Sequence, residues 1–146
     1  MTLDNLLHNL KLLKKQIAWL EISYQRIEKI GLNSDYSIDE FGIFETACGR
    51  FSRSIDFLIR KMFRSIDAYE FENQGTLVDV INHAHKRNLF ADIHEIRIMK
   101  DIRNTISHEY VEEALIEVFK DVLEYIPNLL QVMNNTVEYV EKNAKK

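Results

Sequence analysis

The chain has 146 residues, of which 46% are hydrophobic and 29% charged, as expected for a single globular domain covering residues 1–146. Its formal net charge of −4 excludes a global positive field that would draw it to nucleic acid, DNA included, or to an anionic membrane surface, and leaves local basic patches open. One Pro and four Gly are too few for the turns that a many-stranded fold needs, so the composition predicts long helices.

The N-terminal segment predicts one long helix. Apolar residues recur at alternating steps of three and four from Leu3 to Ile27, which places them on one buried stripe. Gly31 supplies a stop signal, and the polar residues from Asn33 to Tyr36 supply a turn.

A second helix is predicted to start at a capping box, in which Ser37 caps the helix and Glu40 reaches back to it. Apolar residues from Phe41 to Met62 share one face of this helix. A solvated charged face is the default interpretation of its other side, and a phosphate-binding strip is favoured only beside a catalytic site. The basic residues of that side are Arg50, Arg53, Arg60, Lys61 and Arg64.

The second half of the chain predicts three more helices after an acidic loop at residues 67–75. The third helix covers residues 76–86, the fourth begins at a cap at residue 92 and reaches about residue 106, and the last begins near residue 111.

Pro127 falls inside the last helix and is expected to kink or break it locally, and residues 141–146 are expected to fray. Together these elements predict an all-α fold, an antiparallel bundle of four to five helices.

Few features point to a metal, a cofactor or a membrane. His83 and His85 are two residues apart on a predicted helix and therefore point to different sides, and no metal-ligand motif, phosphate loop or nucleophile motif occurs. Cys48 lies at an apolar helical position, as a buried, reduced thiol does. Without a signal sequence or an apolar run long enough to cross a bilayer, the chain is expected to be cytoplasmic, with no metal and no cofactor.

One segment, from Arg103 to Tyr110, concentrates chemically useful side chains. It combines a permanent cation, the Asn104 amide, the His108 imidazole and a phenol within eight residues. Arg binds a phosphate in bidentate fashion, and His moves protons on or off oxygen. The competing interpretation is a basic helix C-terminus, where Arg and His favour the negative end of the helix dipole. Composition alone leaves these two interpretations nearly balanced.

The spacing within the segment adds a constraint. On a continuous helix, Arg103 and Tyr110 share a face, whereas His108 points well round the cylinder from Arg103. Arg103 and His108 therefore meet at one phosphate only if the helix ends between them or if two subunits meet there. An ending is expected near Thr105 to Ser107, which are mediocre helix formers, and a two-fold dimer would join two copies of the segment.

These residues resemble a known family. Arg-x4-His-x-Tyr before a last long helix, in an all-α chain of this length, resembles the HepT-type HEPN proteins and the nucleotidyltransferase substrate-binding-like proteins among them. The layout from Gly75 to Glu113 agrees with the family, and Phe44-Glu45 in the aromatic, basic second helix agrees more loosely. The resemblance spans most of the chain, but its specific part is eight residues long.

The resemblance implies a metal-independent endoribonuclease that acts as a symmetric homodimer on RNA. Such proteins are toxins of toxin-antitoxin modules and are paired with a cognate minimal nucleotidyltransferase as antitoxin. By position, His108 is expected to be the general acid/base, Arg103 to stabilise the scissile phosphate and Asn104 to support it. Tyr110 matches the tyrosine that the partner modifies with AMP. Arg53, Arg60 and Arg64 then become the expected RNA-backbone track.

Two other hypotheses remain open. In the first, the chain is a non-catalytic substrate-binding or accessory subunit of a nucleotidyltransferase, which the negative net charge slightly favours. Burial of Arg103 and His108 against neighbouring helices favours this hypothesis, whereas exposure of both across a dimer cleft favours the enzyme. In the second, the chain is a plain scaffold bundle, which leaves the Arg103–Tyr110 segment unexplained.

Overall fold

The computed structural model of the chain describes residues 2–72, 75–109 and 111–144. These residues form an all-α helical bundle without a strand, which confirms the predicted fold class. The elements are α1 (Thr2–Ile30), α2 (Ile38–Phe57), the π-helix η1 (Leu58–Phe63), α3 (Arg64–Tyr69), α4 (Leu77–Lys86), α5 (Ile93–His108) and α6 (Glu112–Asn143).

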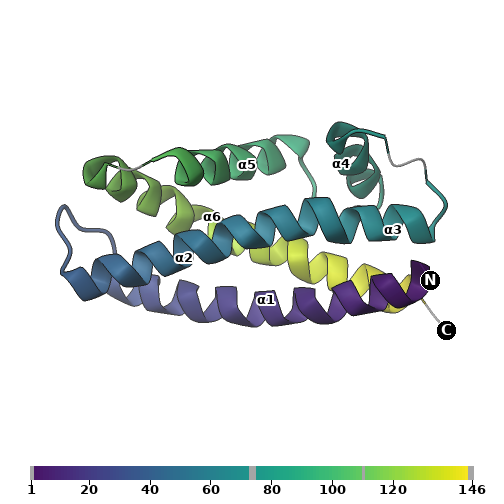
Figure 1. Cartoon of the computed structure of the whole chain (residues 1–146), viewed down its shortest axis with the longest axis horizontal. Helices are drawn as coiled ribbons and strands as arrows, with labels where there is room; N and C mark the ends of the chain where they lie inside the picture. Colours follow the sequence, from purple (N-terminus) through teal and green to yellow (C-terminus); the bar gives the residue numbers. More distant parts are fainter. Residues whose placement is uncertain (1, 73–74, 110, 145–146) are drawn as a thin grey trace.

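The bundle consists of long, roughly antiparallel rods (Figure 1). The elements α2, η1 and α3 follow one another without a break, because the residues at both junctions keep right-handed helical backbone angles. This composite rod runs antiparallel to α1 and to α5, while α6 returns along the bundle beside α1. The short helix α4 packs across one end.

The predicted helix signals are found where the sequence places them. Gly31 ends α1 with a φ of 75°, a backbone conformation that glycine adopts without a steric penalty. Ser37 caps α2 in a complete capping box with Glu40. Thr76 caps α4 in the same way, through Asp79, a capping box that was not predicted.

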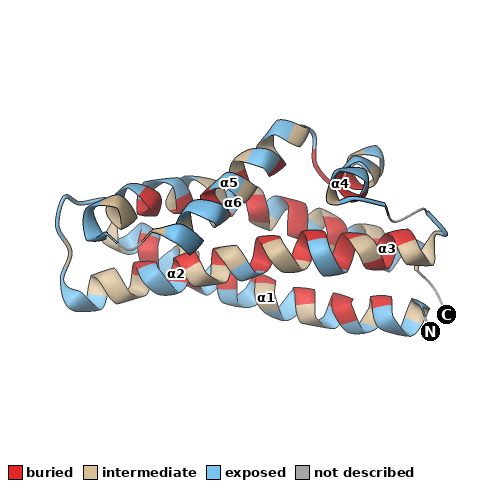
Figure 2. Cartoon of the chain, turned by 45° about the horizontal axis from the view of Figure 1, so that its top comes forward, coloured by how far each residue is buried: buried red, intermediate tan, exposed pale blue. Residues whose placement is uncertain are grey.

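Buried residues lie on the inward faces of the rods, and exposed residues lie on the outer faces (Figure 2). At one end of the core the rings of Phe44 and Phe119 stack with their centroids 4.7 Å apart, and the ring of Tyr36 packs against both. Burying an aromatic or aliphatic side chain of this size stabilises the fold by roughly 1.5–3 kcal/mol. Cys48 is also buried, as expected.

Three local predictions need correction. Residues 67–69 belong to α3, so the expected loop at residues 67–75 begins too early, and Asp67 is fully buried. Pro127 does not break α6, which continues on both sides of it. Residues 141–143 are still helical, with Glu141 bound to Lys14 at 2.9 Å, while residues 145–146 lie outside the described part of the chain.

The π-helix was not predicted. Its six residues include two adjacent buried pairs, Leu58–Ile59 and Met62–Phe63. A helical period of three to four residues, as read from sequence, does not distinguish such a wide turn from ordinary helix; π-turns are found frequently at functional sites. Of the described helices, none is both long enough and apolar enough to cross a membrane.

Candidate functional site

The second half of α5 carries the predicted site. Asp92 caps this helix by accepting a hydrogen bond from the His94 amide at 2.9 Å. Ile96, Met99 and Ile102 then form the buried stripe that holds α5 against the bundle. The residues after Ile102 are thereby fixed at the edge of α5 that borders the composite rod α2–η1–α3.

Arg103 crosses this border and binds Asp56 of α2 with two nitrogens. Its Nε donates to both carboxylate oxygens of Asp56 at 2.9 and 3.0 Å, and its Nη2 donates to Oδ2 at 2.7 Å. Its Nη1 donates to Ser107 Oγ at 2.9 Å, one turn further along α5. The guanidinium is therefore held in one orientation by two helices.

Arg103 still has hydrogen-bond donors that these contacts do not engage. A guanidinium has five N–H donors, and Asp56 and Ser107 engage one on each nitrogen, so each terminal nitrogen keeps one N–H for another acceptor. About a third of the side chain, 32%, is exposed. The hydrogen bonds that Arg103 donates to Asp56 raise the pKa of Arg103 above its ordinary value, so the side chain stays a cation.

A small hollow of about 80 Å³ opens beside this ion pair. Arg103 and Asn104 form its α5 side together with Lys100, and Asp56 and Arg60 form the opposite side. The predicted pair Arg103 and Asn104 thus lines one hollow together with Arg60 from the predicted RNA-backbone track. The hollow has three cations and one acid, and that acid is already paired with Arg103.

His108 lies apart from this hollow. It is the last residue of α5 and is exposed, and among the described residues it has no hydrogen-bond or ion-pair partner. The expected helix ending between Arg103 and His108 is wrong, because α5 continues through both residues. Five residues of continuous helix turn the two side chains about 140° apart. Arg103 and His108 therefore do not converge within one copy of the chain, and the predicted Tyr110 lies outside the described residues.

The three arginines of the predicted RNA-backbone track have different surroundings. Arg53 is exposed on α2, and its guanidinium lies over Gly49 of the preceding turn. Arg60 is exposed on η1 and borders two hollows, the one beside Arg103 and another beside α1. Arg64 is partly buried and borders the hollow beside α1.

Asp56 is the functional residue of the site that sequence reasoning missed. One signal was available, because Asp56 is the acid that interrupts the basic side of the second predicted helix, between Arg53 and Arg60. At three or four residues' distance Asp56 would be expected to pair with Arg53 or Arg60 of its own helix, and only the packing of α5 against α2 identifies Arg103 as its partner.

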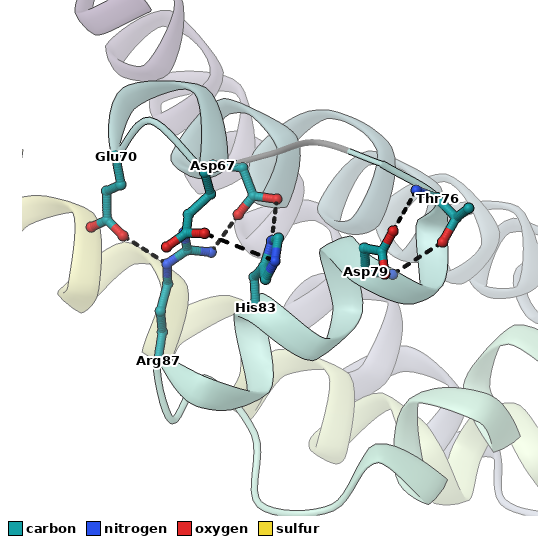
Figure 3. A network of polar contacts seen from close by, with 7 residues as sticks. Asp67, Glu70, Thr76, Asp79, His83 and Arg87 are labelled. Carbon is teal, nitrogen blue, oxygen red and sulfur yellow. Dashed lines mark hydrogen bonds and ion pairs between the residues drawn. The ribbon is translucent and has the colours of Figure 1, made fainter.

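A second polar cluster lies near α4 and was also missed (Figure 3). Asp67 has no exposed surface, and its two carboxylate oxygens contact Arg87 Nη1 at 2.7 Å and His83 Nδ1 at 2.9 Å. Arg87 Nε also donates to Glu70 at 2.8 Å, and Glu70 in turn accepts a hydrogen bond from the Tyr139 hydroxyl of α6. This network joins α3, α4 and α6.

Neither metal binding nor thiol chemistry has a visible site in the described parts of the chain. No group of three or more His, Cys, Asp or Glu side chains there is arranged to hold a metal ion. Burial raises the pKa of Cys48 to about 12, which keeps its thiol protonated near neutral pH.

Comparison of the chain with models of known protein families, with curated proteins and with solved structures finds no match.

Proposed function

We propose that the chain is a metal-independent endoribonuclease that acts as a two-fold homodimer, with Arg103 and His108 as its catalytic residues. By its resemblance to HepT-type HEPN proteins, it would be the toxin of a toxin-antitoxin module with a minimal nucleotidyltransferase as the cognate antitoxin. The observation that carries the proposal is the contrast within α5 between an anchored cation and an exposed imidazole that has no partner among the described residues.

The chemistry needs both properties. RNA carries its own nucleophile, the ribose 2′-OH, so the protein has to remove one proton, supply one proton and stabilise the charge on phosphorus. His108 would take the proton of the 2′-OH as the 2′-oxygen attacks the adjacent phosphorus. The 5′-oxygen takes a proton from water as its bond to phosphorus breaks, which gives a 2′,3′-cyclic phosphate and a 5′-hydroxyl end, and the hydroxide that remains takes the proton from His108. The open N–H groups of Arg103 would bind the non-bridging phosphate oxygens, with Asn104 beside it.

The divergence of Arg103 and His108 on one helix explains why a dimer is part of the proposal. A two-fold axis near the end of α5 would place His108 of one copy opposite Arg103 of the other, or bring all four side chains to one cleft. Tyr110 follows two residues after His108. Its modification with AMP by the partner enzyme would place bulk and negative charge at the same cleft and would block RNA.

Cleavage of total cellular RNA by the purified chain in EDTA tests the proposal. His108→Ala should reduce cleavage by at least ~100-fold, which is the usual size of a general acid/base contribution. His94→Ala is the matched control, because His94 is an exposed histidine at the other end of α5. Equal cleavage by wild type and His108→Ala would remove His108 from the mechanism, and loss of wild-type cleavage in EDTA would contradict metal independence.

The alternative function, a non-catalytic accessory subunit of a nucleotidyltransferase, is favoured by one observation. The Arg103–Asp56 pair is neutral as a unit and is tied across two helices, as a purely structural pair would be. Under this hypothesis the unmodified wild-type chain does not cleave RNA, and Asp56→Asn weakens the association of the chain with the nucleotidyltransferase. Under the ribonuclease hypothesis, Asp56→Asn lowers cleavage because Arg103 loses its fixed orientation.

A further inference from the structure

A second hollow, of about 350 Å³, lies between the start of α1 and the composite rod, on the other side of Arg60 from the Arg103 hollow. Its polar lining residues are Asn5, Asn9, Arg60, Lys61, Arg64 and Ser65. We call it the α1 hollow. Because Arg60 borders both hollows, a ligand strand that passes over Arg60 reaches both.

The α1 hollow is basic although the chain as a whole is acidic. Its lining contains Arg60, Lys61 and Arg64 but neither Asp nor Glu. Arg60 and Lys61 are exposed, and no described acid lies within ion-pair distance of either. Cations without an acidic partner among the described residues are available to an anion from outside, and phosphate is one of the anions that guanidinium and ammonium groups bind.

The amide of Asn9 adds a feature that a bare phosphate would not use. Ser65 Oγ donates its one hydrogen to the Lys61 carbonyl at 2.6 Å, so it must accept the hydrogen bond from Asn9 Nδ2 at 2.7 Å. This chain of bonds fixes the orientation of the amide and leaves the carbonyl oxygen of Asn9 as its acceptor side. An acceptor in a basic hollow matches a ligand that carries N–H donors as well as negative charge.

Apolar surface completes the lining. Leu12 of α1 and Phe57 of α2 border the same hollow and are partly exposed. Cations, an amide acceptor and apolar surface match three features of a nucleotide: its phosphate, the N–H donors at the edge of its base and the apolar face of its base.

We propose that the α1 hollow binds one nucleotide of a single-stranded RNA, next to the site of cleavage. Arg60 and Lys61 hold its phosphate, the Asn9 carbonyl oxygen accepts from the edge of its base, and Leu12 and Phe57 lie against the base. The proposal rests on the proposed ribonuclease function and adds to it a subsite that lets the chain hold the strand on one side of the scissile phosphate.

The test measures binding without cleavage. The probe is a fluorescein-labelled single strand of 2′-O-methyl nucleotides, which lacks the 2′-OH that cleavage needs, and the readout is fluorescence anisotropy with the full chain at several salt concentrations. Lys61→Gln should raise the Kd roughly fivefold to tenfold at low salt and reduce the slope of log K against log salt by about 0.7, the value for one lost phosphate contact on a single strand.

Two further variants complete the design. Asn9→Asp keeps the size of the side chain but adds a negative charge and should raise the Kd at least as much as Lys61→Gln. Lys120→Gln is the matched control, because Lys120 is an exposed lysine in the first third of α6. This part of α6 lies at the opposite end of the bundle from the start of α1 (Figure 1). The Kd of this variant should stay within about twofold of wild type, since it removes the same charge without a phosphate contact.

The outcomes separate this proposal from the ribonuclease hypothesis. Wild-type Kd and salt slope in Lys61→Gln and Asn9→Asp would overturn the subsite, even if the chain cleaves RNA through His108. A raised Kd in both variants, with an unchanged control, would support the subsite, even if the chain cleaves no RNA. Displacement of the probe by AMP at equal concentration would overturn the assignment to a strand, because a free nucleotide would then suffice.

Discussion

Arg87 and Arg103 make the same kind of contact in two regions of the molecule. Each guanidinium binds an aspartate of the composite rod α2–η1–α3, with a shortest N–O distance of 2.7 Å in both pairs. The regions differ in burial. The side chains of Arg87 and Asp67 are 8% and 0% exposed, whereas those of Arg103 and Asp56 are 32% and 36% exposed.

The degree of burial decides whether each pair only holds helices together or can also bind a ligand. Both carboxylate oxygens of Asp67 are satisfied within the chain, and Arg87 is shared between Asp67 and Glu70. Such a closed network holds helices together, because removing one partner leaves an uncompensated charge away from water. The Arg103 pair is open to solvent, keeps free N–H groups and borders a hollow. The same residue types therefore serve structure in one region and are accessible to a ligand in the other.

The largest difference between the two regions is expected in stability. Asp67→Ala should lower the free energy of unfolding by about 3–5 kcal/mol, because it leaves Arg87 buried without its carboxylate. Asp56→Ala, the matched control in the exposed pair, should cost less than about 1 kcal/mol. Urea unfolding followed by circular dichroism measures both. Equal losses in the two variants would show that burial does not separate the pairs.

The rate of RNA cleavage, in contrast to stability, should depend on the exposed Arg103–Asp56 pair. Arg103→Ala should lower RNA cleavage by roughly 100-fold, the size of the loss of one charge-stabilising donor, with little change in stability because the pair is exposed. Arg97→Ala is the control, since Arg97 is an exposed arginine of the same helix. Rates of RNA cleavage and urea midpoints are measured on the same samples. A loss of activity that follows only a loss of folded protein would assign Arg103 to structure.

The smallest effect concerns Tyr139, whose hydroxyl donates to Glu70 at the edge of the buried network. Tyr139→Phe should cost about 1 kcal/mol, the typical value of one hydrogen bond. Burial, and then the bond to Glu70, raise the pKa of Tyr139 above its ordinary value of 10.0. The folded chain therefore holds this proton more tightly than the unfolded chain, so the stabilisation is present below pH 10 and is lost as the pH rises above it.

Unfolding free energies of wild type and Tyr139→Phe, measured from pH 8 to 11, check this pH dependence. Their difference should shrink as the pH rises above about 10, the ordinary pKa of a tyrosine, because the unfolded wild type then releases a proton that the folded wild type retains. A difference that stays constant over this range would mean that the environment of Tyr139 does not favour its neutral form.

The sequence by itself determined the helices and most of their ends. The apolar period of α1, the stop at Gly31, the capping box at Ser37 and the cap at Asp92 act within a few residues along the chain, so local pattern was enough to predict them. The apolar pattern likewise predicted that Cys48 is buried. The same local information singled out the segment from Arg103 to Tyr110 by its residue types.

Only the tertiary structure decided how those residue types are used. Arg103 and Asp56 are 47 residues apart, and Arg87 and Asp67 are 20 apart, so neither pair follows from a local pattern. The helix through Arg103 and His108 continues although Thr105 to Ser107 are mediocre helix formers, because buried Ile102 and partly buried Ile106 pack against the core. Burial free energy summed over the packed helices outweighs local preference, and it makes the Asp67 network inaccessible while leaving the Arg103 site open to solvent.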